Sequence, residues 1–412
     1  MKLHCDIQLP TSKSESNRAL MIAAYGGFIP DFQNLSESND TQLLKNILLS
    51  TDTLAPVVVR YDRDSNLEFF RHVIPNRKVS VSMPKNAPKE IDIADCGTAA
   101  RFLTTFLACT EGDWLLTGSE RMKQRPIKPL VDVLLQLGAE IRYVKKNGFL
   151  PLRIVGKPIR GGKVQVDTTQ SSQFASSLLL AAPTWSQGLE LDLVGNPSSM
   201  PYLDMTLAMM RQFGAEVLCN GKTIIVKSKP YQPDSFSVSA DWTAASYWYE
   251  MAAFSEDCKI ILRGLSIGST ITQGDAIIAD WMQLFGVKTE PIENGILLTK
   301  TPFEKKQLCF DFTNHPDLYP TIAATCAGLG MEAEFQGIES LRFKESDRVE
   351  AMRTELAKIR HRPLRFCSHN DHRIVMALAP LSLLLDSASF DHPEVVEKSY
   401  PNFWKDADFL CF

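Results

Sequence analysis

The sequence predicts an α/β protein of two globules, built from six βαβαββ-like repeats, three per globule, with the last repeat shortened. Three observations predict this class. Helices rich in Ala, Ser and Thr alternate with amphipathic helices that end in Gly. This alternation has a period of roughly 75 residues. Short apolar segments lie between the helices. This period is too long for a solenoid and each unit mixes helix with sheet, so two globules of three units are the expected packing.

The first repeated element is a helix with small residues on every face. Copies are expected at Ser16–Ala24, Thr98–Ala108, Gln173–Ala182, Thr243–Ala253, Leu318–Ala327 and His372–Leu381. Small side chains let neighbouring backbones approach closely, so we expect these helices to be buried at the centre of each globule.

The second repeated element is an amphipathic helix that ends in Gly and is followed by an extended segment. Clear copies run over Leu130–Gly138, Leu207–Gly214 and Ala279–Gly286, while Val349–Arg360 lacks the Gly and Asp40–Ser50 is a weaker copy. Gly after the last turn favours the left-handed C-cap of a helix. These helices are expected on the outside, each against a sheet.

Short strands are expected between the helices. They are Leu152–Val155, Lys163–Val166, Leu189–Leu193, Thr223–Val226, Lys259–Leu262, Gly295–Thr299 and Leu308–Phe312. Two repeats are irregular. Extra charged sequence lies between Ser50 and Cys96, and the stretch from Arg360 to His372 is short by roughly 20 residues, enough for one hairpin.

The composition favours a reduced, cytoplasmic protein without a structural metal. The 412 residues carry a net charge of -4 and include nine Cys, with no Cys-x-x-Cys pair and no His-Cys grouping at zinc spacing. Residues 1–10 lack the apolar core of a signal peptide, and no apolar run reaches the ~18 residues that a membrane helix needs. The sequence therefore predicts no nucleic-acid partner and no membrane span.

Three motifs place cations or hydroxyls at the start of a helix, where a phosphate or carboxylate binds well. Residues 9–18 include Lys13, Ser14 and Arg18, residues 120–127 carry three cations, and residues 168–174 are rich in hydroxyls. The structural alternatives are N-capping by a single Ser and a solvated charged surface.

Polar segments also precede the buried helices of the C-terminal third. Residues 341–348 are the densest charge cluster, and residues 370–373 begin the most apolar helix. Asp317 either caps a helix or belongs to a functional site. Cations outnumber carboxylates across these motifs although the chain is acidic, so we expect a small polyanionic substrate. Neither G-x-x-x-x-G-K-[ST] nor G-x-G-x-x-G occurs, which argues against a nucleotide.

In this order, the motifs from Leu9 to Trp404 resemble those of the 5-enolpyruvylshikimate-3-phosphate synthases, or 3-phosphoshikimate 1-carboxyvinyltransferases. The resemblance implies an inverse α/β prism of two globules with the active site in the cleft. It also implies that the chain crosses between globules near Pro10–Ser12 and Lys227–Pro233. Residues 1–11 and 230–412 would then form the globule with both termini, and residues 12–229 the central globule.

The resemblance further implies an enzyme that transfers the enolpyruvyl (carboxyvinyl) group of phosphoenolpyruvate to the 5-hydroxyl of shikimate 3-phosphate, releasing phosphate. This is a step of the shikimate pathway to chorismate and the aromatic amino acids, and it needs no metal or organic cofactor. The family is usually monomeric. The residues implied as catalytic are Asp317, Glu345 and Lys13.

The two substrates would be held by two sets of residues that share Gln173. The resemblance assigns phosphoenolpyruvate to Lys13, Gly97, Arg125, Gln173, Arg348, Arg373 and Lys398. It assigns shikimate 3-phosphate to Ser14, Arg18, Ser171, Ser172, Gln173, Ser199, Tyr202, Asp317, Ser340 and Lys344.

The chain departs from the family pattern at four positions and lacks a hairpin near residues 361–368. The positions are Thr11 for a usual Gly, Asp95 for Asn or a small residue, Phe102 for Pro, and Ser340 for Asn. Two alternatives stay open. One is the sister carboxyvinyltransferase that acts on UDP-N-acetylglucosamine, against which Ser14 after Lys13 argues, because that enzyme has Asn there. The other is a non-catalytic or weakly active paralogue that binds phosphorylated metabolites.

Overall fold

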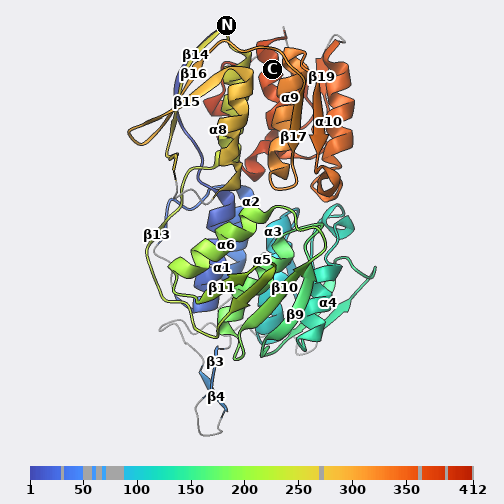
Figure 1. The fold of residues 1–412 in the computed structure, drawn as a ribbon. Helices are drawn as coiled ribbons and strands as arrows, with labels where there is room; N and C mark the ends of the chain where they lie inside the picture. The colour runs from blue at the N-terminus through green and yellow to red at the C-terminus, as the bar shows by residue number, and fades with distance from the viewer. Residues whose placement is uncertain are drawn as a thin grey trace. The chain divides into compact units, whose positions relative to one another are not determined.

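The computed structural model describes residues 1–28, 32–49, 58–61, 67–70, 88–268, 273–360, 364–385 and 388–410. Contacts between residues divide the chain into two compact units, each described here by itself (Figure 1). Unit 1 contains Met1–Ser16, Asn34–Thr41 and Ser237–Phe412, and unit 2 contains Asn17–Gln33 and Gln42–Phe236. The domain limits 1–11 with 230–412 and 12–229 stay a prediction, because contact density alone does not show which segments fold independently.

Unit 2 contains two four-stranded sheets of the same topology. The first uses β5 (Lys89–Asp92), α3 (Gly97–Cys109), β6 (Gly112–Thr117), α4 (Lys128–Gln136), β7 (Glu140–Tyr143) and β8 (Leu152–Gly156). The second uses β9 (Gly162–Asp167), α5 (Gln173–Ala181), β10 (Leu189–Val194), α6 (Met200–Gln212), β11 (Val217–Asn220) and β12 (Thr223–Val226). Each sheet joins a parallel pair to an antiparallel hairpin, in the orders β5-β6-β8-β7 and β9-β10-β12-β11.

Unit 1 contains a third sheet of this kind, in which the first strand comes from the N-terminus and the other three follow much later in the chain. Its elements are β1 (Lys2–Gln8), α7 (Trp242–Phe254), β14 (Asp257–Arg263), α8 (Ile278–Trp281), β15 (Val287–Ile292) and β16 (Gly295–Lys300). The strand order is β1-β14-β16-β15, and β1 pairs in parallel with β14 from Lys2 opposite Asp257 to Gln8 opposite Arg263. Three copies of the predicted βαβαββ unit are therefore present.

Two further pairs of strands in unit 1 are parallel. β17 (Leu308–Asp311) pairs with β18 (Ala333–Gln336) across α9 (Tyr319–Leu329). β19 (Leu364–Phe366) pairs with β20 (Ala388–Phe390) across α11 (His372–Leu378). α10 (Arg348–Leu356) lies between the pairs along the chain, and no hairpin is found in the described residues between α10 and β19, where the sequence is short.

The remaining elements are short or lie where the chain passes between the units. They are α1 (Lys13–Gly26), β2 (Phe32–Gln33), α2 (Asn39–Leu49), β3 (Val58–Tyr61), β4 (Leu67–Phe70), β13 (Phe236–Ser237) and α12 (Phe403–Asp406). The small-residue helix predicted from Ser16 begins three residues earlier, at Lys13.

Burial separates the two kinds of helix as the sequence predicts. All thirteen residues of α7 and all seven of α11 are buried, and in α3 every residue except Thr98 is buried. In α4, by contrast, only Leu130, Val131, Val133 and Leu134 are buried, which is the single apolar face of a helix on a sheet.

Hydroxyl pairs join the small-residue helices in each unit. Thr105 on α3 and Ser177 on α5 have their hydroxyl oxygens 2.6 Å apart, and Ser246 on α7 and Thr321 on α9 have theirs 3.1 Å apart. The paired residues are separated by 72 and 75 residues along the chain, close to the repeat length expected from the sequence. These contacts show why Ser and Thr recur in helices that are otherwise apolar: a buried hydroxyl needs a partner, and the neighbouring helix supplies it.

One buried acid interrupts this pattern. Glu250, near the middle of α7, is completely buried, and neither carboxylate oxygen has a hydrogen-bond partner among the described residues. Burial therefore raises its pKa well above the ordinary value of 4.5. The neutral acid is the form that the folded protein accommodates.

We predict that Glu250→Gln removes a pH-dependent loss of stability. Between 4.5 and the raised pKa, the folded protein keeps a proton that the unfolded chain releases, so wild-type stability falls as the pH rises, by up to about 1.4 kcal/mol per pH unit. Thermal melting of both proteins from pH 5 to pH 8 should show that the melting temperature of the variant increases relative to that of the wild type as the pH rises. The exposed Glu304→Gln is the control, and a pH-independent difference for Glu250→Gln would refute the assignment.

Candidate active site

The centre of the polar cluster in unit 1 is Arg348, the first residue of α10, whose side chain is 1% exposed. Its guanidinium donates to three carboxylates: Nε to Asp371 Oδ2 at 2.8 Å, Nη1 to Asp317 Oδ1 at 2.9 Å, and Nη2 to Glu345 Oε2 at 2.9 Å. A buried guanidinium is tolerated only when its donors are satisfied, and the planar fork suits carboxylates. Arg348 therefore holds three acidic side chains in fixed positions.

The chain brings these groups together at the starts of consecutive helices. Asp347 caps α10 by accepting from the N–H of Glu350 at 3.1 Å, so Glu345 and Arg348 lie on either side of a helix start. Asp371 caps α11 by accepting from the N–H of Arg373 at 3.0 Å. Local capping geometry thus fixes the backbone from which the clustered side chains extend.

The turn before Asp371 is strained. His369 and Asn370 both adopt positive φ angles, 52° and 53°, which residues other than Gly rarely adopt. His369 Nε2 lies 2.9 Å from the carboxylate of the buried Glu355, and that carboxylate also accepts from the N–H of Cys367 at 2.9 Å. These contacts hold the turn that presents Asp371 to Arg348.

Asp317 lies between two arginines. Its oxygens accept from Arg348 at 2.9 Å and from Arg373 Nη2 at 2.8 Å, and Lys344 Nζ is 3.9 Å away. Burial raises the pKa of Asp317, but the charges of Arg373, Lys344 and Arg348 outweigh burial and hold that pKa well below its ordinary value. The N-caps here are His315 and Leu318, so Asp317 does not occupy the capping position that was the alternative.

A second carboxylate in unit 1 holds two lysines. Asp40, on α2, is 3.1 Å from Lys13 Nζ through Oδ2 and 3.1 Å from Lys398 Nζ through Oδ1, and its side chain is only 8% exposed. Burial raises the pKa of Asp40, but the charges of the two lysines outweigh burial, and the pKa lies below its ordinary value. The sequence predicts Asp40 in a helix but not in the site. A single acid in the first turn of a helix does not indicate which residues, distant in the sequence, it will contact.

His372 is buried beside these groups. Its pKa lies well below 6.5, chiefly because of burial and then because of the positive charge of Lys13. Nδ1 is 3.7 Å from Asp371 Oδ1, and neither ring nitrogen has a hydrogen-bond partner among the described residues. The imidazole is therefore neutral at pH 7.

In unit 2, the polar residues gather where α1, α5 and α6 approach one another. Arg18 is 3% exposed and donates from Nε to Thr206 Oγ1 at 2.7 Å and from Nη2 to the carbonyl of Tyr202 at 3.0 Å. Thr206 in turn donates to Ser176 Oγ at 3.0 Å. The backbone and hydroxyls of α5 and α6 thus fix the direction of one cation.

The serines at the N-cap positions of α5 and α6 do not cap these helices with their hydroxyls. Ser172 and Ser199 occupy the N-cap positions of α5 and α6, yet neither side chain makes a capping hydrogen bond. Ser199 has a φ of 59°, a left-handed conformation that costs energy for a residue with a Cβ. Ser171 accepts from the N–H of Gln173 at 3.2 Å, and Gln173 Nε2 donates to Thr98 Oγ1 at 3.3 Å.

Gly97 makes room for Arg125. A Cβ at Gly97 would lie 2.7 Å from Arg125 Nη1 and 3.0 Å from Nη2, so only Gly lets this guanidinium rest against the start of α3. The buried Arg101 ties the two segments together by donating to the carbonyl of Gly97 at 3.1 Å and to that of Pro126 at 3.0 Å. Arg101 was not predicted, because its role depends on this packing rather than on a local pattern.

The predicted site residues are thus divided between the units. Unit 1 carries Lys13, Ser14, Asp317, Ser340, Lys344, Glu345, Arg348, Arg373 and Lys398, and unit 2 carries Arg18, Gly97, Arg125, Ser171, Ser172, Gln173, Ser199 and Tyr202. Ser340 lies in the 3₁₀ turn Glu339–Phe343 without a hydrogen bond to this cluster among the described residues. The atypical Asp95 accepts a short hydrogen bond from Ser119, so its charge is engaged within unit 2.

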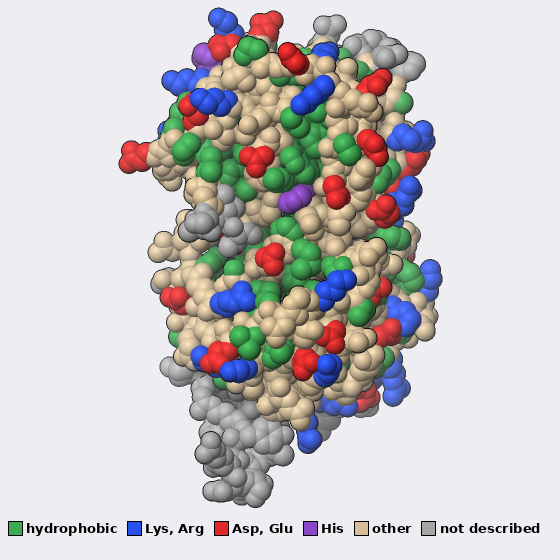
Figure 2. Space-filling model, viewed as in Figure 1, with side chains coloured by type: hydrophobic (Ala, Val, Ile, Leu, Met, Phe, Trp, Pro, Cys, Tyr) green, Lys and Arg blue, Asp and Glu red, His purple; other side chains and the backbone are tan. Residues whose placement is uncertain are grey.

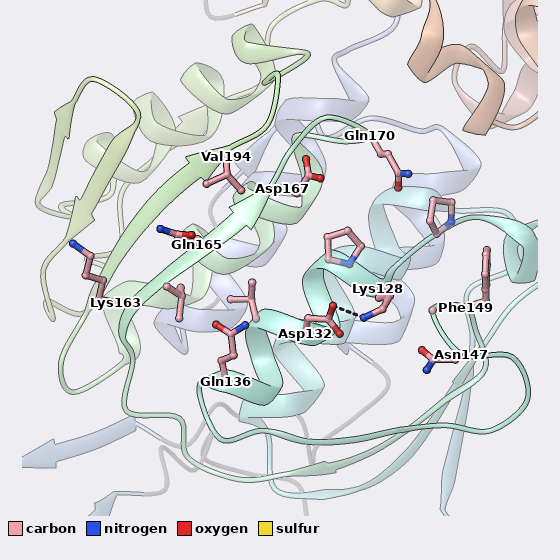
Figure 3. A pocket seen from close by; sticks show the side chains of 15 residues that line it. Lys128, Asp132, Gln136, Asn147, Phe149, Lys163, Gln165, Asp167, Gln170 and Val194 are labelled. Atoms are coloured by element: carbon pink, nitrogen blue, oxygen red, sulfur yellow. Dashed lines mark hydrogen bonds and ion pairs between the residues drawn. The ribbon is translucent and has the colours of Figure 1, made fainter.

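A separate cavity of about 830 Å³ lies in unit 2 beside α4 and β9 (Figure 3). Its polar lining includes Lys128, which is 2.6 Å from Asp132, and Gln165 on β9. Pro126 and Gln170 also line it, next in sequence to Arg125 and Ser171, but no predicted site residue does. The cavity therefore adjoins the binding motifs without being part of them.

The charged surface agrees with the low net charge. Figure 2 shows Lys and Arg interspersed with Asp and Glu on the visible face, without a broad basic area. Among the described residues, no helix is long and apolar enough to cross a membrane. In the same part of the chain, no group of three or more His, Cys, Asp or Glu side chains is placed to hold a metal ion.

Comparison with known proteins identifies the family. The sequence model of EPSP synthase (3-phosphoshikimate 1-carboxyvinyltransferase) matches residues 1–407. A 3-phosphoshikimate 1-carboxyvinyltransferase of Bacteroides fragilis is 37% identical over 426 residues, covering 98% of this chain and 95% of that protein. Another from Histophilus somni is 34% identical over 426 residues, covering 97% and 95%.

A solved structure agrees on the fold. EPSP synthase from Acinetobacter baumannii superposes with a TM-score of 0.70 at 20% sequence identity, covering 99% of this chain and 96% of that one. At that identity the likeness shows the α/β fold alone. The family match and the sequence relatives confirm the resemblance inferred from the motifs, and the chain belongs to the EPSP synthase (3-phosphoshikimate 1-carboxyvinyltransferase) family.

Proposed function

We propose that this chain transfers the carboxyvinyl group of phosphoenolpyruvate to the 5-hydroxyl of shikimate 3-phosphate and releases phosphate. The observation that carries the proposal is the cluster in which Arg348 holds Asp317 and Glu345 while Arg373 also binds Asp317. It supplies fixed carboxylates for proton transfer together with cations for an anionic substrate. Neither the UDP-N-acetylglucosamine enzyme nor a non-catalytic paralogue is favoured by the family match and the relatives.

The reaction needs three proton movements and two bond changes. The 5-hydroxyl of shikimate 3-phosphate loses a proton as its oxygen bonds to C2 of phosphoenolpyruvate, and C3 gains a proton. The tetrahedral intermediate then loses a C3 proton as the bond from C2 to the phosphate oxygen breaks. We assign these transfers to Asp317, Glu345 and Lys13.

The low pKa of Asp317 limits the role we give it. A carboxylate held ionised by Arg373, Lys344 and Arg348 is a weak base, so we propose that Asp317 first orients the 5-hydroxyl by accepting a hydrogen bond from it and takes its proton only as the oxygen bonds to C2. Lys13, held by Asp40, is the candidate acid, and Glu345 is the candidate for transfer at C3. Arg348, Arg373 and Lys398 of unit 1, together with Arg125 of unit 2, would hold phosphoenolpyruvate.

We propose that Arg18 and the helix-entrance hydroxyls of unit 2 hold the phosphate of shikimate 3-phosphate. Arg18 is buried and fixed by Thr206 and by the Tyr202 carbonyl, which lowers the entropy lost when it binds a phosphate. Ser172 and Ser199 do not use their hydroxyls as helix caps, and neutral donors at a helix entrance suit a phosphate.

We also propose that the fold is the two-globule inverse α/β prism with six repeats and a shortened last repeat. The three sheets with one strand order support the repeat, and the parallel pairs β17–β18 and β19–β20 match its first half. The cytoplasmic, monomeric state stays a prediction that gel filtration and fractionation would test.

The reaction itself is tested by phosphate release. We expect release when phosphoenolpyruvate and shikimate 3-phosphate are both present, and none with either alone. Calorimetry should show shikimate 3-phosphate binding without phosphoenolpyruvate, through Arg18 and the hydroxyls of unit 2. Heat from UDP-N-acetylglucosamine and none from shikimate 3-phosphate would overturn the substrate assignment.

We predict that Asp317→Asn lowers turnover by about 10²–10⁴-fold, because it keeps the shape of the side chain but removes the charge that orients the hydroxyl. Phosphate release is the assay, and the melting temperature reports folding. Asp347→Asn is the matched control, because Asp347 caps α10 and Asn caps a helix about as well. Full phosphate release by Asp317→Asn would remove it from the catalytic set.

Two substitutions test the position of Arg125. Arg125→Ala should weaken phosphoenolpyruvate by about 1.5–3 kcal/mol through loss of a charge-assisted contact, with much less effect on shikimate 3-phosphate. Gly97→Ala should weaken phosphoenolpyruvate in the same direction but less, because its Cβ displaces the guanidinium while the charge remains. Arg121→Ala serves as the control. Equal weakening of both substrates would mean that Arg125 is structural.

A further inference from the structure

Both ends of helix α10 contact the strained turn of residues 367–371. At the start of the helix, Arg348 donates from Nε to Asp371 Oδ2 at 2.8 Å. In the last turn of the helix, Glu355 Oε1 lies 2.9 Å from His369 Nε2. Positions 348 and 355 are about two helical turns apart and therefore lie on the same face of α10. One helix thus contacts the strained part of the turn and the acid that follows it.

Two carboxylates also fix the start of this turn through its backbone. The N–H of Cys367 donates to Glu355 Oε2 at 2.9 Å, and the N–H of Ser368 donates to Asp391 Oδ1, directly after β20, at 2.7 Å. The Glu355 side chain is 1% exposed, and its one other partner among the described residues is Lys358, whose Nζ is 2.6 Å from Oε2. Glu355 is therefore a buried anchor that is directed mainly at the turn.

The turn needs such an anchor because its conformation is costly. His369 and Asn370 are consecutive residues with φ angles of 52° and 53°. Residues other than Gly persist in this left-handed region only where surrounding contacts hold them there. The His369 side chain is 30% exposed, and its contact with Glu355 attaches it to a buried group. This contact therefore opposes relaxation of the turn to a more favourable backbone conformation.

The position of Asp371 follows from the conformation of the turn, and it affects the proposed site through printed contacts on both sides of Glu345. Asp371 Oδ2 accepts from Ser346 Oγ at 3.0 Å as well as from Arg348 Nε. Arg348 in turn donates to Glu345 and to Asp317 at 2.9 Å each. A shift of Asp371 would therefore move the segment that carries Glu345 together with the guanidinium that holds Asp317.

We propose that Glu355 and His369 are positioning residues, which hold the strained turn so that Asp371 keeps Arg348 and Glu345 in place for phosphoenolpyruvate. Neither residue is assigned a contact with a substrate. The inference rests on the proposed function, in which Arg348 holds phosphoenolpyruvate and Glu345 serves transfer at C3.

The test compares two substitutions of His369 by kcat/KM for phosphoenolpyruvate. His369→Ala removes the imidazole but keeps a Cβ in the left-handed region, and we expect a loss of roughly tenfold, since the strain of one such residue corresponds to about that factor. His369→Gly removes the strain together with the imidazole and should return kcat/KM to within about twofold of the wild type. Calorimetry should show an unchanged Kd for shikimate 3-phosphate in both variants, and melting temperatures report folding.

Three results would overturn the proposal. Wild-type kcat/KM in His369→Ala would mean that the contact with Glu355 does not position the site. Equal losses in the Ala and Gly variants would mean that the imidazole is needed for itself and not to hold the strained turn. Equal weakening of phosphoenolpyruvate and shikimate 3-phosphate would indicate a general structural role.

Glu355 gives an independent test from the other side of the contact. Glu355→Gln should lower kcat/KM for phosphoenolpyruvate, because an amide has one acceptor oxygen in place of two. Adding His369→Gly should recover most of that loss. Lys358→Ala is the matched control, since it removes a partner of the same carboxylate that lies outside the turn. If His369→Ala fails to fold, the proposal stands or falls on whether His369→Gly recovers the loss in Glu355→Gln.

The two hypotheses fail in different ways. Absence of phosphate release from the folded wild type, with both substrates present, would refute the proposed function. Normal release by the wild type together with an unaffected His369→Ala would refute only the role of the Glu355–His369 contact.

Discussion

The arrangement of unit 1 depends on one buried guanidinium. Arg348 joins carboxylates that come from the starts of three helical segments, and each of them would be a poorly compensated buried charge without it. Because a fork of donors has fixed geometry, the acids cannot shift independently. Acidic side chains on three separate stretches of chain are thereby held in one cluster, and the cost of burying them is offset by mutual pairing.

This cluster changes how the basic motifs are understood. The sequence suggests cations in excess, but in unit 1 the five lysines and arginines Lys13, Lys344, Arg348, Arg373 and Lys398 contact four carboxylates, Asp40, Asp317, Glu345 and Asp371. Under the proposed function, the affinity of unit 1 for anions would come less from a large positive field than from cations already held in place by acids, which lose little freedom when a substrate arrives.

Much of the fold could be predicted because its cause is local. Small-residue helices, Gly-ended amphipathic helices and strands such as Thr223–Val226 follow from composition and periodicity. β1 was missed although Leu3 and Ile7 alternate with polar residues, because its partner β14 lies about 250 residues further along the sequence. Asp40 and Arg101 were missed for a similar reason: each takes its role from burial and from contacts with residues distant in the sequence, which a short stretch of sequence does not reveal.

The pairing of β1 with β14 has a consequence for synthesis on the ribosome. β14 emerges about 250 residues after β1, a delay of roughly 12–50 s at ordinary elongation rates. All the segments of unit 2 are made within that interval, so it can fold while the first strand of unit 1 still lacks its neighbour. An unpaired strand edge left waiting this long is a target for chaperones and for aggregation, and its exposed Lys2, His4 and Asp6 help to keep it soluble meanwhile.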